Sequence, residues 1–381
     1  MINSAKYEVN LYLNGVLVGD CRRLAQNLKF VRRRTKIGAD SIDFTINDVL
    51  FNRWCVERNY TINDLLKPLA LECRVVRNGI ELVGGFLATM PGYTPRQASA
   101  DLNMRFDGFL NLLNGVYIRN SSTGLPLGTI RGSASGLVVS MINFANSMSA
   151  GGGKGYGFNA GHIDTLANIT HTFDNYKTVK DWICDRCDNT TGAGPFDVYF
   201  HADKTYDIYA DSNFGDVIND WVAFYPTLLN NTSVTSISAS EVEDFASAVI
   251  GVGSGEISSN AQENTAITDY VSEGSAVAEY GYYEIMHQDS SVSTPSVLSR
   301  NILATLWNRS NPIWRPEITL HGKQVSPQPT GEHKIWIGDT ITINNSADLT
   351  GMTNGDFRVN ELSVAVSSAN DETIQPTLER V

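Results

Sequence analysis

Residues 335–343 read IWIGDTITI, residues 357–366 read FRVNELSVAV, and residues 374–378 read IQPTL. In each segment apolar side chains alternate with polar ones, which is the period of a strand with one face on a core and the other in water. Ile318-Thr-Leu320 begins the series with the same alternation. The last third of the chain is therefore predicted to be a set of half-buried strands. Nothing in it resembles an active site.

A helix is expected just before these strands. Thr294-Pro295 provides an N-cap followed by proline at the first helical position, and apolar residues then recur every four positions: Leu298, Ile302 and Leu306. This pattern predicts a helix over about 295–308. Further upstream, residues 248–255 (AVIGVGSG) predict a strand that its glycines end. A second strand is expected from the alternation of Tyr280, Tyr282, Glu284 and Met286.

The first part of the chain carries two hairpin signals. Asn14-Gly15 and Asn78-Gly79 each separate two alternating segments, and Asn-Gly is the preferred pair for a two-residue hairpin turn. Residues 42–48 (IDFTIND) predict a further strand. Residues 1–118 are therefore expected to form a β-rich domain.

The middle of the chain differs in character. Apolar spacing predicts helices over 133–148 and 178–187, and residues 196–200 and 206–209 predict a short hairpin around Asp203-Lys204. An α+β insert over 119–231 is the simplest interpretation, followed by a second β-rich domain over 232–381 that includes the helix near 295–308. The fold class predicted for the whole chain is α+β, mainly β.

Composition limits the classes of function. The chain has 381 residues, a formal net charge of −12 and a pI near 5.0, which argues against affinity that depends on neutralising phosphates. One basic cluster, Arg32-Arg33-Arg34 with Lys36, is expected to be solvated in a loop, with an anionic partner as the alternative. No signal sequence or membrane-spanning stretch is found, so a soluble product made in the cytoplasm is expected.

The five cysteines do not suggest a disulfide framework, and Cys21, Cys55 and Cys73 are expected to be small buried apolar groups. Cys184 and Cys187 have the spacing with which a zinc site or redox pair often begins, but no second pair accompanies them. Packing in a core is the favoured interpretation, and metal binding and redox chemistry are the alternatives. No catalytic or cofactor-binding residue is predicted.

Two histidines lie near carboxylates, in the pairs His162/Asp164 and His171/Asp174, and any general-base hypothesis would start there. Chance is sufficient to explain both pairs, because no hydrolase motif accompanies them. Asp203, Asp207 and Asp211 recur every four residues, but the glycine and spacing of a calcium loop are absent. We expect a solvated strand face there, with a cation site as the alternative.

Glycine-rich runs and aromatic residues give no clear site. Residues 151–154 (GGGK) lack the Ser or Thr and the glycine spacing of a phosphate loop, and Gly253-Ser-Gly255 lacks the third glycine of a dinucleotide fingerprint. Some aromatic residues could stack on sugars, although such side chains mostly fill cores and interfaces in β-rich proteins. They are Trp221, Phe224, Tyr225, Trp307 and Trp314.

Several of these segments, in this order, resemble the central tail hub proteins of long-tailed bacteriophages, also called baseplate hub or tail-tip minor tail proteins. The segments that carry the resemblance are the two Asn-Gly hairpins, Ser41–Ile46, Gly84-Gly85-Phe86, 248–255, 280–284, 298–307, 338–341, 357–359 and 372–378. The resemblance covers nearly the whole chain and is clearest over 1–118 and 232–381.

This resemblance implies a homotrimer at the tail tip of the virion, with two β-barrel-like tube domains per subunit forming a pseudo-sixfold ring. The implied partners are a hexameric distal tail or tube protein, tail fibre or tip proteins, and the tape measure protein. Genomic DNA would cross the channel without specific binding. Because the chain ends at Val381, just after its last expected strand, no receptor-binding or wall-cutting extension is expected.

Two other classes of function stay open at this stage. One is a β-protein that binds carbohydrate or a receptor at the host surface through its tyrosines and tryptophans. The other is a cell-wall hydrolase that uses His171 or Asp174. A non-enzymatic structural protein is the favoured hypothesis.

Overall fold

A computed structural model describes residues 5–95, 100–149, 156–173, 175–188, 195–225, 234–241, 245–256, 265–290, 292–310, 314–322, 325–331, 333–345 and 355–381. Strands predominate and helices are few, so the predicted class, α+β and mainly β, is confirmed. Among the described residues, no helix is both long enough and apolar enough to cross a membrane.

The N-terminal strands form two hairpins, as the Asn-Gly pairs predict. β1 (Tyr7–Leu13) pairs with β2 (Val16–Asp20), and β5 (Leu71–Arg77) pairs with β6 (Ile80–Leu87). Both residues of each turn have positive φ: 50° and 79° at Asn14-Gly15, and 49° and 84° at Asn78-Gly79. The remaining N-terminal strands are β3 (Gln26–Arg33), β4 (Ser41–Asn47), β7 (Gly92–Pro95) and β8 (Ala100–Gly108).

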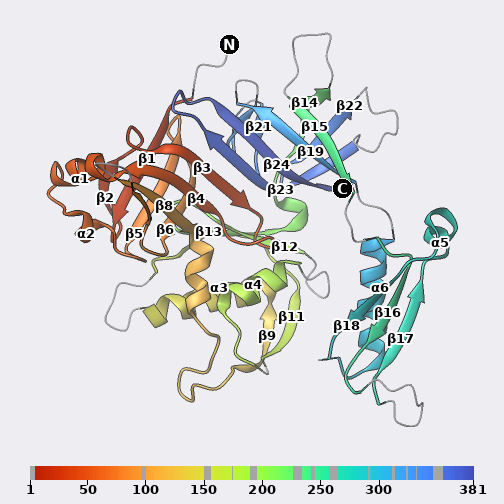
Figure 1. The fold of residues 1–381 in the computed structure, drawn as a ribbon. Coiled ribbons are helices and arrows are strands. Elements are labelled where there is room, and N and C mark those ends of the chain that lie inside the picture. Colours follow the sequence, from red (N-terminus) through yellow and green to blue (C-terminus); the bar gives the residue numbers. More distant parts are fainter. Residues whose placement is uncertain are drawn as a thin grey trace.

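The C-terminal strands continue the N-terminal sheet. Its 14 strands include a path β15-β19-β24-β23-β3-β4-β8-β6-β5-β1-β2, in which β23 (Gly355–Val366) pairs antiparallel with β3 and Val364 lies opposite Phe30. In Figure 1 the red strands β3 and β4 and the blue strands β23 and β24 lie side by side. The other C-terminal members are β14 (Val217–Tyr225), β15 (Val234–Glu241), β19 (Trp314–His321), β22 (Thr340–Asn345) and β24 (Glu372–Arg380).

Because the end strands β2 and β15 do not pair with each other, the described strands form an open sheet and no closed barrel. One hydrophobic core underlies both halves, from Val9 and Phe30 to Phe357 and Val364. The division at residues 118 and 231 stays a prediction, but the N- and C-terminal strands share a sheet and a core.

The middle segment has its own core. α3 (Ala134–Ser149) and α4 (Val179–Asp188) form where helices are expected, and the hairpin of β12 (Phe196–Phe200) and β13 (Thr205–Ala210) is also confirmed. Trp182 and Ile183 are fully buried in this second core. Short strands and two 3-10 helices complete the segment: η1 (Phe109–Gly115), β9 (Gly128–Ser133), β10 (Asn159–Ile163), β11 (Asn168–Phe173) and η2 (Asp211–Asn213).

A small module follows, at the lower right of Figure 1. β16 (Ala248–Val252) pairs with β17 (Thr268–Ser272) and β18 (Glu284–Gln288), and α6 (Pro295–Arg309) packs on one face through Leu298, Ile302 and Leu306. The expected helix near 295–308 is thus confirmed. Tyr280, expected in a strand, instead ends α5 (Gly274–Tyr280), because Glu273 caps the first turn and Gly281 ends it at φ 91°.

Two further departures have local causes. Residues 335–343 are not one strand: β21 (Lys334–Ile335) pairs with β20 (Ser326–Pro327), and a turn at Gly338 (φ 86°) precedes β22. The Asp339 carboxylate fixes this turn by accepting the N–H of Trp336 at 2.8 Å. Two short helices were not predicted, α1 (Asp48–Val56) and α2 (Ile62–Leu65), which are capped by Asn47 and Thr61.

The expectation of a solvated cluster is wrong for Arg32 and Arg34, although Arg33 and Lys36 between and beyond them are partly exposed. Arg32 is 1% exposed and Arg34 is 3% exposed. The Arg34 guanidinium forms ion pairs with Asp197 and Asp211, and also donates to Asn360 Oδ1 at 3.2 Å. These charges can be buried because carboxylates and an amide oxygen replace the water they lose.

Neighbouring contacts extend those of Arg34. We call the whole set, formed by Arg32, Arg34, Asp197, Asp211 and Arg358, the junction. Arg32 donates to Asp40 at 2.6 Å and to the carbonyl of Phe200, and its guanidinium lies 4.5 Å from the Tyr199 ring centroid. Arg358 donates to Asp211 Oδ2 at 2.6 Å. Although burial opposes it, the guanidinium groups of Arg34 and Arg358 hold the pKa of Asp211 below its ordinary value. The junction therefore joins β3, the middle segment and β23.

Replacing Arg34 with alanine should lower the free energy of unfolding by about 3–5 kcal/mol, because Asp197 would be left buried without its cation. Denaturant unfolding would measure the loss. The matched control is Arg53→Ala in α1, whose side chain is 82% exposed in its pair with Glu57 and should cost less than about 1 kcal/mol. Equal losses in the two variants would contradict a structural role for the junction.

Candidate functional site

One face of the 14-stranded sheet is polar across the boundary between its N- and C-terminal halves. Register places Arg105, Asp43 and Lys29 opposite one another on β8, β4 and β3, and the row continues through Ala365 on β23 to Thr373 on β24. The alternate residues Phe30, Ile42, Phe106 and Val364 point the other way and are fully buried. The sheet thus separates a hydrophobic core from a solvated wall, which we call the polar face.

A second row of the polar face begins with Arg33, which forms a 2.6 Å ion pair with Glu361 on β23. Opposite Glu361 lies Thr377 on β24, and Ser363 lies opposite Gln375. Lys29, Arg33 and Arg105 bring positive charge to the face, and Asp43, Asp101, Asp107, Glu317 and Glu361 bring carboxylates. Opposite charges alternate with small hydroxyl and amide groups, so the face has no strongly basic patch.

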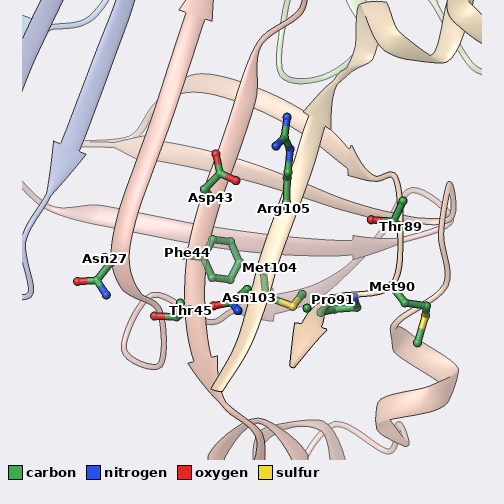
Figure 2. A pocket seen from close by; sticks show the side chains of 11 residues that line it. Asn27, Asp43, Phe44, Thr45, Thr89, Met90, Pro91, Asn103, Met104 and Arg105 are labelled. Atoms are coloured by element: carbon green, nitrogen blue, oxygen red, sulfur yellow. The ribbon is translucent and has the colours of Figure 1, made fainter. Parts of the chain in front are cut away.

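Two hollows open on the polar face. One, of about 380 Å³, lies over β4 and β8. Figure 2 shows Asp43 and Arg105 projecting from these adjacent strands, with Met90 and Pro91 at the rim. Burial raises the pKa of Asp43, although Arg105 and Lys29 oppose the shift. The other hollow, of about 540 Å³, lies on the C-terminal side and is lined by Lys29, Glu317, Glu361 and Gln375.

A smaller hollow of about 290 Å³ lies between the β12–β13 hairpin and residues 334–339. Tyr199, Tyr209 and Trp336 line it, and Lys334 donates to Asp216 at 2.5 Å at its edge. The Trp336 indole N–H donates to the Tyr199 hydroxyl at 3.2 Å, and burial raises the pKa of the Asp339 carboxyl to about 6. Because Trp336 bonds to Tyr199 and Lys334 bonds to Asp216, the polar groups around this hollow satisfy one another. We therefore interpret it as a structural contact next to the junction and not as a substrate site.

The cysteines lie in cores. Cys21, Cys55 and Cys73 are buried, as expected. Cys187 is 2% exposed in the second core and Cys184 is half-buried beside it on α4. Burial raises the pKa of Cys184 to about 11 and that of Cys187 well above the ordinary thiol value, which disfavours the thiolate that metals bind. Among the described residues, no cluster of three or more ligand-type side chains includes them.

The histidine pairs are placed differently from one another. His162 Nε2 lies 2.9 Å from Asp164 Oδ1, while Asp164 Oδ2 accepts from Ala210 N and the Asn213 amide, so this carboxylate fixes the end of β13. His171 lies on β11 with its ring edge-on to Phe173 at 4.5 Å. Asp174 lies outside the described residues, so the structure does not test a His171/Asp174 pair.

The three aspartates do not form one site. Asp203 accepts the N–H of Thr205 in the hairpin turn, Asp207 accepts from His201 and Tyr209, and Asp211 belongs to the junction. The expected solvated strand face is therefore wrong for Asp207, which is 6% exposed. Alternation alone could not show that the face of β13 carrying Asp207 is covered by the middle segment.

Other expected features fall where the structure gives no side-chain detail. Residues 151–154 lie outside the described residues. The aromatic residues considered for sugar stacking lie in β14, α6 and β19, where only the backbone is described. They are Trp221, Phe224, Tyr225, Trp307 and Trp314. The polar face was not predicted as a site, because no sequence signal gives the β3–β23 pairing.

The fold is similar to that of several solved phage tail proteins. It matches the tail protein from Neisseria meningitidis MC58 with a TM-score of 0.61 at 11% identity, over 98% of this chain and 96% of that one. It matches the 43 kDa tail protein of prophage MuSo2 from Shewanella oneidensis with a TM-score of 0.62 at 12% identity, over 97% of each chain.

A third solved structure with this fold is prophage tail protein gp18 from Listeria monocytogenes EGD-e, at a TM-score of 0.53 and 9% identity, over 97% of this chain and 94% of that one. No family model matches the chain, and its sequence matches no curated protein. At such low identity the likeness is one of fold, and at that level it agrees with the resemblance to tail proteins.

The two α4 thiols provide a test of the metal alternative. Cys187→Ser should lower the free energy of unfolding by about 1–3 kcal/mol, because a hydroxyl would be buried in an apolar core. Cys184→Ser, at the half-buried position, should change it by less than about 0.5 kcal/mol. Zinc should leave the melting temperature of the wild-type chain unchanged. A zinc-dependent rise that both variants lose would show metal binding instead.

Proposed function

We propose that this chain is a structural protein of the virion, a trimeric hub at the tail tip that joins a hexameric tail ring or tube to the tip apparatus. The proposal is supported first by the fold, because this chain is similar along nearly its full length to three phage tail proteins. No catalytic role is proposed.

The observation that carries the proposal is the polar face. Strands from both ends of the chain pair through β3 and β23, so residues more than 300 positions apart form one continuous wall. In a ring of three copies, this wall would line a channel. Charges of both signs, with carboxylates in slight excess, would give passing DNA little to bind, because DNA affinity depends on clustered Lys and Arg.

In this proposal the partners are a hexameric distal tail or tube protein, tail fibre or tip proteins, and the tape measure protein, and genomic DNA passes without specific contacts. The site of action is the tail tip of the virion. Threefold symmetry could match a sixfold ring if each copy presents its N-terminal and C-terminal strands as two similar elements. The shared sheet is consistent with such an arrangement, since each half contributes several adjacent strands.

Self-association is the first expected outcome. Sedimentation equilibrium of the purified chain, 41.7 kDa as a monomer, should give about three times that mass. Images of assembled tail tips should show threefold density beneath a sixfold ring. A strict monomer that does not bind tail rings would contradict the hub proposal.

The polar face should tolerate neutral changes but not added positive charge. A Ser363→Arg, Thr377→Arg variant should slow DNA ejection from assembled particles, with a delay that shrinks as salt rises, because added arginines bind phosphate. The matched variant Ser363→Gln, Thr377→Gln adds bulk without charge and should eject at the wild-type rate. Equal delays in the two variants would mean that the face does not line the DNA path.

A further inference from the structure

The small module has an exposed apolar face opposite α6. Ile250, Tyr270 and Met286 lie opposite one another on its three strands, and they are 36%, 48% and 62% exposed. Tyr282 extends the row, since its hydroxyl lies 2.9 Å from that of Tyr270. We call these four residues the module face. An exposed apolar and aromatic row of this kind is typical of surfaces through which proteins contact one another.

A second exposed aromatic patch lies on the middle segment. The rings of Tyr117 and Tyr176 meet edge to face at 6.5 Å, and both residues are more than half exposed. The Tyr176 hydroxyl donates to the carbonyl of Gly124, which places it beside the exposed Leu125. Arg119 follows Tyr117 by two positions on the same extended segment and is exposed as well. We call Tyr117, Arg119, Leu125 and Tyr176 the Tyr117 patch.

The two surfaces carry opposite charges. Glu284, next to the module face, accepts the Tyr282 hydroxyl at 2.5 Å and forms no ion pair within the described residues. Arg119 likewise pairs with no described carboxylate, and its guanidinium donates to the Met148 sulfur at 3.9 Å. The described charged residues of the module are mainly acidic: Glu256, Asp269, Glu273, Glu284 and Asp289, against Arg300 and Arg309.

We propose that the module face binds the Tyr117 patch of a second copy of this chain, with Arg119 of one copy meeting Glu284 of the next. Both surfaces are exposed in the single chain, so they do not meet within it. Because the two surfaces differ, the contact is head to tail, and three such contacts can close a ring. Tyrosine and arginine are the residues that such contacts favour, since a guanidinium can bond a carboxylate and lie over aromatic rings.

This inference rests on the proposed ring of copies and assigns the surfaces that form it. A charge swap tests it. Glu284→Arg and Arg119→Glu should each weaken self-association of the full chain by about tenfold or more, and the double variant should recover most of the loss because the pair is restored with reversed sign. Sedimentation velocity over a range of concentrations would measure the dissociation constants.

Two matched controls change charge away from these surfaces. Glu256→Arg lies on the same module outside the module face, and Arg53→Glu lies on α1 with an 82% exposed side chain. Both should associate like the wild type. Circular dichroism should show all variants folded, as expected for exposed positions.

The outcomes separate this inference from the hub proposal. If the wild-type chain forms a trimer and neither single variant weakens it, the assigned surfaces are wrong while the trimer stands. If both single variants weaken association but the double variant does not recover it, the two residues do not meet, and the inference is overturned. If the wild-type chain is a monomer at every concentration, both proposals fail.

Discussion

The buried ion pairs of Arg34 are the constraint on which the rest of the structure depends. Arg34 follows directly after β3, and its guanidinium reaches Asp197 on β12, Asp211 after β13 and Asn360 on β23. Removing such a cation from water is costly, so the group is stable only where all three partners are assembled. These ion pairs therefore form only when the N-terminal, middle and C-terminal segments are arranged as observed, and they stabilise that arrangement over others.

This arrangement creates the polar face. With the junction formed, β3 and β23 lie edge to edge with Val364 opposite Phe30, and their outward side chains continue in common rows. A second buried pair acts in the same way: Arg77 on β5 donates to Glu372 on β24 at 2.6 Å, and the Tyr7 hydroxyl donates to the same carboxylate. Charged groups inside the protein thus fix the register of a wall whose outer surface is nearly balanced in charge.

The small module contrasts with this body. Among the described residues, its buried core is small, with Val249, Val292, Leu298, Ile302 and Leu306, and α6 packs on one face of its three strands. An uncovered apolar row raises the free energy of an isolated chain because water must surround it. Burial of the row against a partner releases that water and favours association. The 14-stranded sheet provides a continuous wall, and the module carries the surface that we propose joins copies of the chain.

The sequence by itself determined the local elements, because their causes are local: the positive φ of Asn14-Gly15 and Asn78-Gly79, the proline at the start of α6, and the alternation in β23 and β24. It also gave the fold class. It could not show that Arg32 and Arg34 are buried, that Asp207 and Asp211 have different partners, or that β3 pairs with β23. Those facts depend on contacts between residues far apart in the chain, where burial and the pairing of charge are decided only once the segments have packed together.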